Sequence, residues 1–269
     1  MLSIIISIFV GTAVFFAMFS LADAGGLWSG VLAFLAFIAS QAISGIFLKK
    51  RVQEKMNRVQ GILAEGQKRI QTKMQRWQLR PPGSVQAAQR EIFEDTKVFV
   101  KEAIEATKDL ERFKLWVPMI DRQIATAQFQ LYWMIKEFKK VDILMPKALF
   151  FDPTMSAMKI ARMYMRGDDI EAISKVYVKA VKHLKYNQGV LLNAAYSWIL
   201  VKREKIDEAF KALTAALKNS DNEVLKRNHE LLMNNRIAHF SNSGLGDQWY
   251  SLMLEEPKVK TQRQRAVFR

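Results

Sequence analysis

"GIFLKKRVQEKMNRVQ", residues Gly45 to Gln60, changes character in its middle. Up to Leu48 the stretch is apolar, and from Lys49 onward it is basic and amphipathic. An apolar run that ends in a cluster of cations is typical of a helix that leaves a lipid bilayer. This stretch therefore bears on two questions, whether the chain spans a membrane and on which side the rest of it lies.

Two uncharged runs precede the basic residues. Leu2–Ala22 and Leu27–Leu48, of 21 and 22 residues, contain no Asp, Glu, Lys or Arg. A helix needs about 20 apolar residues to cross the hydrocarbon core of a bilayer. Only "DAGG", with Asp23 as its one charge, separates the runs, so the two helices must be antiparallel. The sequence predicts a transmembrane helical hairpin over residues 1–48.

Two other interpretations of the first run are weaker. "ADA" at Ala22 to Ala24 resembles a signal-peptide cleavage site, but the run lacks a basic n-region and exceeds the usual h-region of about 7–15 residues. A buried pair of soluble helices is also disfavoured, because two uncharged runs of this length are rare outside membranes. Cleavage would still leave the second helix as an anchor.

The positive charge after the second run predicts the orientation. Lys49, Lys50 and Arg51 follow it directly, and cytoplasmic flanks carry the Lys/Arg excess. We therefore expect an inner (plasma) membrane protein in which both ends of the hairpin and the C-terminal domain are cytoplasmic. The absence of cysteine is compatible with a cytoplasmic domain.

The formal net charge of +15 is concentrated in two segments. Residues 49–80 hold ten Lys/Arg against two Glu, and residues 258–269 hold five Lys/Arg and no acid. Such segments predict binding to an acidic surface, either anionic lipid or a protein partner; nucleic acid is less favoured because no binding motif accompanies the charge. The candidate residues are Lys49, Lys50, Arg51, Lys55 and Arg58 on the membrane flank, and Lys258, Lys260, Arg263, Arg265 and Arg269 in a basic flexible tail.

Beyond the membrane hairpin we expect a second, basic amphipathic hairpin over residues 49–117. Apolar residues at three-four spacing run from Val52 to Trp77 and again from Val85 to Val117. "RPPGS" at Arg80 to Ser84 breaks the pattern, since proline cannot continue a helix. Two helices of similar length with a short link predict an antiparallel pair, with a short coiled coil as one form of it.

An internal repeat follows. "AQFQLYWMIKEFKKV" at Ala127–Val141 aligns without gaps with "AYSWILVKREKIDEA" at Ala195–Ala209, an offset of 68 residues. A middle copy begins near Ile160, two or three residues out of register, and a looser fourth copy extends to Pro257. An offset of 68 is two periods of about 34, the length of a tetratricopeptide repeat. Residues 118–257 are therefore predicted to form helical repeats.

The repeat region resembles the tetratricopeptide-repeat (TPR) family over about half of the chain. The matching residues are Tyr132, Phe138, Ala148, Asp152 and Pro153 in the first copy, Gly167, Asp168, Glu171, Ala172 and Ala180 in the second, and Ala209, Leu213, Ala216 and Leu217 in the third. The resemblance implies an all-α solenoid whose stacked hairpins bind a protein segment. The residues expected to pack the repeats are Phe138, Ala148, Ala172, Ala180, Ala209 and Ala216. The whole arrangement looks like that of bacterial membrane-anchored TPR assembly factors.

The sequence shows no convergent catalytic groups. His183, His229 and His239 are far apart, and no metal-ligand spacing occurs. We therefore expect no enzyme activity, catalytic residue, metal or cofactor. The expected function is a membrane-anchored scaffold or adaptor that binds a protein partner, with homo-oligomers as a further option. An accessory or regulatory subunit of a membrane enzyme complex is the alternative, and a nucleic-acid tether through the basic ends is a weaker one.

Overall fold

A computed structural model describes residues 2–20, 25–80, 82–182 and 184–257. These residues form helices and connecting turns without a strand, so the protein is all-α as predicted. The chain divides into two compact units, one up to Leu149 and one from Phe150 onward. The expected boundary between residues 117 and 118 lies inside the first unit. Each unit is described by itself.

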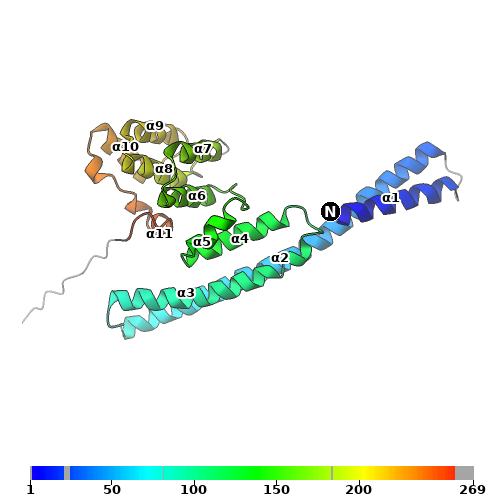
Figure 1. The fold of residues 1–269 in the computed structure, drawn as a ribbon, viewed down its shortest axis with the longest axis horizontal. Helices are drawn as coiled ribbons and strands as arrows, with labels where there is room; N and C mark the ends of the chain where they lie inside the picture. Colours follow the sequence, from blue (N-terminus) through cyan, green and yellow to red (C-terminus); the bar gives the residue numbers. More distant parts are fainter. Residues whose placement is uncertain (1, 21–24, 81, 183, 258–269) are drawn as a thin grey trace, which may run out of the picture. The chain divides into compact units, whose positions relative to one another are not determined.

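In the first unit, α1 (Leu2–Ser20) is antiparallel to the first half of α2 (Gly26–Leu79), as Figure 1 shows. Small residues allow the close approach: Ser7 donates to Ser40 at 3.0 Å, and Gly11 faces the Ala33 carbonyl. The stripe of small residues in α1 thus packs the hairpin against itself. Both helices are long and apolar enough to cross a membrane.

Helix α2 continues without a break from the apolar run into the basic stretch, over 54 residues. The residues after Leu48 are mostly Lys, Arg, Gln, Glu and Met, which are good helix formers. At about 1.5 Å per residue, the part from Lys49 to Leu79 is about 45 Å long. One rigid element therefore joins the apolar hairpin to the second hairpin.

Helix α3 (Val85–Lys108) packs along this basic half of α2 (Figure 1). It begins at Ser84, whose hydroxyl accepts the Ala87 N–H at 3.1 Å. The shared core contains Val59 of α2 and Phe99, Val100 and other residues of α3. Gly66 brings the α2 backbone against the Phe99 ring, because a side chain at this position would overlap it.

Helix α3 ends at Lys108, so the helix predicted to reach Val117 is too long. The chain turns through a short 3₁₀ helix, η1 (Glu111–Phe113), and returns toward the start of α1. Phe113 and Val117 still pack inward, against a cluster that includes Leu110 and Ile120. Their apolar spacing reflects burial on a turn, which the helical pattern does not distinguish from burial on a helix.

Helical hairpins follow in both units. The first unit contains α4 (Ile120–Met134) with α5 (Phe138–Leu144). The second contains α6 (Pro153–Arg166) with α7 (Ile170–Val181), α8 (Val190–Lys202) with α9 (Ile206–Leu217), and α10 (Glu223–Met233). Helix α5 ends at Leu144, two residues before Pro146, because proline removes a backbone donor and breaks the helix.

The turns inside these hairpins repeat in backbone detail. One residue of each turn has the left-handed backbone conformation with positive φ: Lys136, Gly167, Glu204 and Asn235. In each turn the next N–H donates to the carbonyl five residues back, for example Glu137 to Tyr132 at 3.0 Å and Lys205 to Leu200 at 2.9 Å. This is the six-to-one bond of the Schellman motif. Positions 136 and 204, and 167 and 235, differ by 68 residues, so helical-repeat-like packing is present.

In the fourth copy, short turns and a single helical turn replace the second long helix of the hairpin. After α10 the chain forms the 3₁₀ turns η2 (Ile237–His239) and η3 (Ser243–Leu245) and the short α11 (Asp247–Tyr250). This C-terminal segment, residues 237–256, returns to α8: the Asn242 amide donates to the Ala194 carbonyl at 2.9 Å. Helix α8 is consequently buried on all sides from Leu191 to Leu200.

Candidate functional site: basic surfaces

Part of the positive charge on α2 is paired with acids of α2 itself, of α3 or of the residue that follows α3. Lys55 and Arg58 both reach Asp109 at 3.3 Å. Lys73 pairs with Glu91 at 2.6 Å and with Asp95 at 2.5 Å. Two of the five residues predicted to meet an external acidic surface therefore have partners inside the hairpin.

The pKa values follow this pairing. Hydrogen bonding from Lys55, and then the nearby positive charges, hold the pKa of Asp109 below its ordinary value. Hydrogen bonds to Asp95 and Glu91 raise the pKa of Lys73. Both shifts favour the charged forms, so these ion pairs persist at neutral pH.

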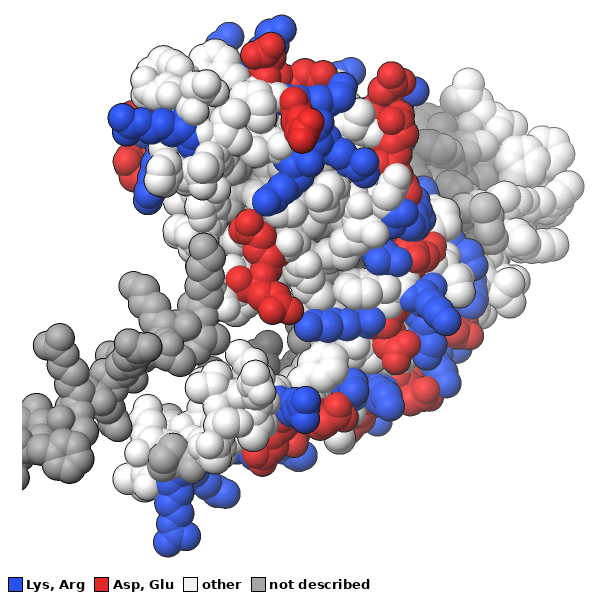
Figure 2. Space-filling model, turned by 60° about the vertical axis from the view of Figure 1, so that its left-hand side comes forward, with Lys and Arg blue, Asp and Glu red and all other residues white. Residues whose placement is uncertain are grey.

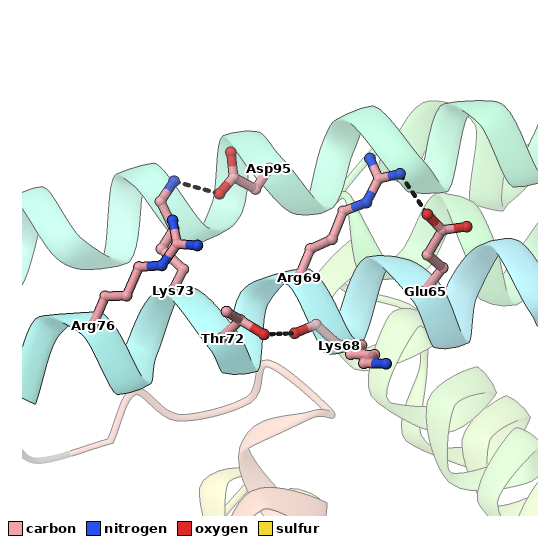
Figure 3. Close-up of a pocket in the computed structure, with 7 residues that line it drawn as sticks. All are labelled: Glu65, Lys68, Arg69, Thr72, Lys73, Arg76 and Asp95. Atoms are coloured by element: carbon pink, nitrogen blue, oxygen red, sulfur yellow. Dashed lines mark hydrogen bonds and ion pairs between the residues drawn. The ribbon is translucent and has the colours of Figure 1, made fainter.

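Figure 3 shows the open pocket beside these pairs. Arg69 turns back to Glu65, four residues earlier on α2, at 2.5 Å. Lys68 and Arg76 also line the pocket, and neither has an acidic partner among the described residues. Exposed side chains and paired charges give this pocket little capacity to select a ligand.

The membrane flank is less well matched. Lys49, Lys50 and Arg51 are exposed and have no acidic partner in the described part of the chain. The Arg51 guanidinium lies 5.2 Å from the centre of the Phe47 ring, the last aromatic ring of the apolar run. The predicted tail, residues 258–269, lies outside the described residues.

Charges of both signs are mixed over the face drawn in Figure 2. Unmatched cations must therefore be found residue by residue. In the second unit three of them lie close together on and just after α7, where Lys175, Lys179 and Lys182 line a shallow cavity of about 630 Å³ around Val178. We call these four residues the lysine face.

The lysine face lacks a counter-charge in the part of the chain that the structure describes. None of its three lysines has an ion-pair partner within the ranges that the structure describes. Val178 is 50% exposed between them. Burial, and then the charge of Lys179, lower the pKa of the neighbouring Lys159. The arrangement suits an acidic partner with an apolar contact. It was not predicted from the sequence, because the net charge is concentrated in residues 49–80 and 258–269.

The residues predicted to pack the repeats differ in burial. Ala148, Ala209 and Ala216 are buried, whereas Ala172, Ala180 and Phe138 are partly exposed. Ala209 and Ala216 lie on α9, which packs on α8.

The surface of α8 that the C-terminal segment covers is closed to a partner. Trp249 lies edge-on to Trp198, with ring centres 5.8 Å apart. The Glu255 carboxylate accepts both indole N–H groups, at 3.0 Å from Trp198 and 2.7 Å from Trp249. The chain thus covers this face of α8 with its own residues.

The two histidines that the structure describes, His229 and His239, are not part of the surfaces described above. His229 stacks on Phe210 and lies 3.0 Å from the Thr214 hydroxyl, His239 is in η2, and His183 is outside the described residues. Among the described residues, no group of three or more His, Asp or Glu side chains is placed to hold a metal ion.

No protein-family model, no curated protein and no solved structure matches the chain. The functional argument therefore rests on the geometry above.

Proposed function

We propose that the protein is a non-enzymatic scaffold, anchored in the membrane by α1 and α2, whose second unit binds an acidic protein partner on the lysine face. The observation that carries this proposal is a set of three lysines around an exposed valine, none of which has an ion-pair partner among the described residues. Charged surfaces of this kind raise association rates and select oppositely charged partners.

The membrane part of the proposal is supported by the surface of the first hairpin. Its large apolar side chains face outward: Phe9 is 72% exposed and Ile43 is 70% exposed. Such a surface is unfavourable in water and favourable in lipid. The flank from Lys49 to Arg51 supports a cytoplasmic position for everything that follows.

Membership of the TPR family is part of the proposal. It is supported by helix-turn-helix copies with one backbone conformation at each turn and a 68-residue offset between equivalent turns. In such proteins each hairpin buries its apolar face only against its neighbours, and the outer surface is left for partners.

Charge reversal tests the partner site. In the full chain, Lys175→Glu with Lys179→Glu should weaken capture of the partner from solubilised membranes by about tenfold or more, because attraction becomes repulsion. The matched control is Lys211→Glu with Lys218→Glu, two exposed lysines on and just after α9. Equal losses for the two pairs, or no loss for either, would refute binding on the lysine face.

A further inference from the structure

The turn after α3 lies at the level of the last turns of the apolar run. We call residues 110–119 the return segment. The Leu2 N–H donates to the Leu115 carbonyl at 2.9 Å, and the Ser3 hydroxyl donates to the Trp116 carbonyl at 3.3 Å. Gln41 of α2 donates to the Ser3 carbonyl at 3.0 Å. The return segment is thus fixed beside Gln41–Leu48, ahead of the first charged residue of α2.

The side chains of the return segment suit the interfacial layer of a bilayer. Leu115 is 65% exposed and Met119 is 52% exposed, although both are apolar. Trp116 lies between them in sequence, and Trp is enriched where hydrocarbon meets the lipid headgroups. A position in the membrane interface explains this exposure, since lipid would cover the two side chains.

A cavity of about 320 Å³ separates the return segment from α2. Its walls are mainly apolar and include Phe47, Leu48, Phe113 and Trp116, with Arg112 at its edge as the one charged lining residue. The Arg112 side chain is 57% exposed. An apolar cavity with one cation matches an acyl chain attached to a phosphate.

The charges around this cavity leave a positive excess. Asp109 is shared by three cations, Lys55, Arg58 and Arg112. The unmatched cluster Lys49–Arg51 is adjacent in sequence to Leu48, which lines the cavity. A negative group at this level would compensate the excess, and the headgroup layer supplies such groups.

We propose that this cavity binds one anionic phospholipid, with its phosphate at Arg112 and an acyl chain between Phe47 and Trp116. The inference rests on the membrane insertion proposed above and is independent of the lysine face. It assigns the return segment a role beside the two spanning helices, as an interfacial element that fixes the level and tilt of α2.

The test uses the full chain in nanodiscs of phosphatidylcholine with a minor share of phosphatidylglycerol, followed by native mass spectrometry of retained lipid. The wild type should retain one phosphatidylglycerol in preference to phosphatidylcholine. Arg112→Gln should lower this retention about fivefold, the effect of about 1 kcal/mol per cation near an anionic surface. The control, Arg90→Gln, removes the same charge from an exposed site near the other end of α3 and should change nothing.

A second pair covers a variant that fails to fold. Leu115→Gln should also lower lipid retention, because it replaces an exposed apolar side chain that the lipid would cover. The fold should be kept, since the Leu115 backbone carbonyl still accepts the bond from Leu2. Val98→Gln, at a 70% exposed site of α3, should not lower lipid retention. Equal retention of the two lipids, equal effects of Arg112→Gln and Arg90→Gln, or displacement by excess inorganic phosphate would overturn the lipid site alone. Extraction of the protein by carbonate would overturn the membrane anchor as well.

Discussion

The α2–α3 hairpin and the lysine face of α7 are both basic by sequence, yet their charges are used differently. In the hairpin, Lys55, Arg58 and Lys73 meet acids of the same unit. On and just after α7, Lys175, Lys179 and Lys182 meet none among the described residues. The hairpin contains more cations, whereas a larger fraction of the cations on the lysine face has no acidic partner among the described residues. Net charge per segment is therefore a poor guide to a binding surface.

The largest expected effect concerns the core of the second unit rather than the lysine face on its surface. If the second unit is held together around α8, its stability should depend on the C-terminal segment. Trp249 is fully buried against Trp198, so Trp249→Ala should lower the free energy of unfolding by about 3–5 kcal/mol. Chemical denaturation in detergent measures this. A change below about 1 kcal/mol would show that the segment does not hold the unit.

The next effect tests whether α2 and α3 pack closely enough for their charges to meet. Gly66→Ala places a methyl group into the Phe99 ring and should destabilise the hairpin by about 1–3 kcal/mol. Gly61 has open space around it, so Gly61→Ala should stabilise α2 by about 1 kcal/mol through helix propensity. Thermal melting of the two variants should shift in opposite directions, and shifts of the same sign would contradict the packing.

A crossed pair of substitutions sharpens the comparison itself. Asp109→Asn should lower the melting temperature slightly and leave partner capture unchanged, because its charge serves the hairpin. Lys175→Glu with Lys179→Glu should reduce partner capture and leave the melting temperature unchanged. Loss of both properties in either variant would mean that the two regions are not functionally distinct.

The smallest effect is the pH dependence of the hairpin. The pKa of Asp109 is lowered in the folded state, so its stabilising contribution is complete above the ordinary Asp pKa and is lost as pH falls through the lowered value. The difference in melting temperature between the wild type and Asp109→Asn should therefore be constant near neutral pH and vanish in acid. A difference that grows in acid would contradict the assigned pairing.

Long-range periodicity made most of the fold predictable. The uncharged runs indicated the first hairpin, "RPPGS" located the end of α2 near Leu79, and the 68-residue offset matched equivalent turns at Lys136 and Glu204. The end of α3 was not predictable, because apolar residues on a turn keep the same spacing as on a helix. One feature of the sequence indicated that another segment covers α8. The helix "VLLNAAYSWILVK" has no polar face, as in a helix buried on all sides.

The binding surfaces were less predictable than the fold. Pairing between Lys55 and Asp109 depends on the register of α2 against α3, which a single sequence does not specify. The lysine face can be recognised only in the folded unit, where the described residues place no acidic partner beside the three lysines. Charge runs reveal where cations are numerous, and geometry is needed to show which of them are already paired.

The most direct measurement uses the absence of cysteine from the chain. Lys179→Cys on the lysine face and Lys211→Cys on α9 each introduce a single thiol, which a membrane-impermeant maleimide can label. The account predicts no labelling of either variant in intact cells. In inside-out vesicles, the thiol at position 211 should label fully, whereas that at position 179 should be protected until high salt releases the partner. Labelling in intact cells, or equal labelling of both positions in low-salt vesicles, would contradict a cytoplasmic scaffold that holds its partner on the lysine face.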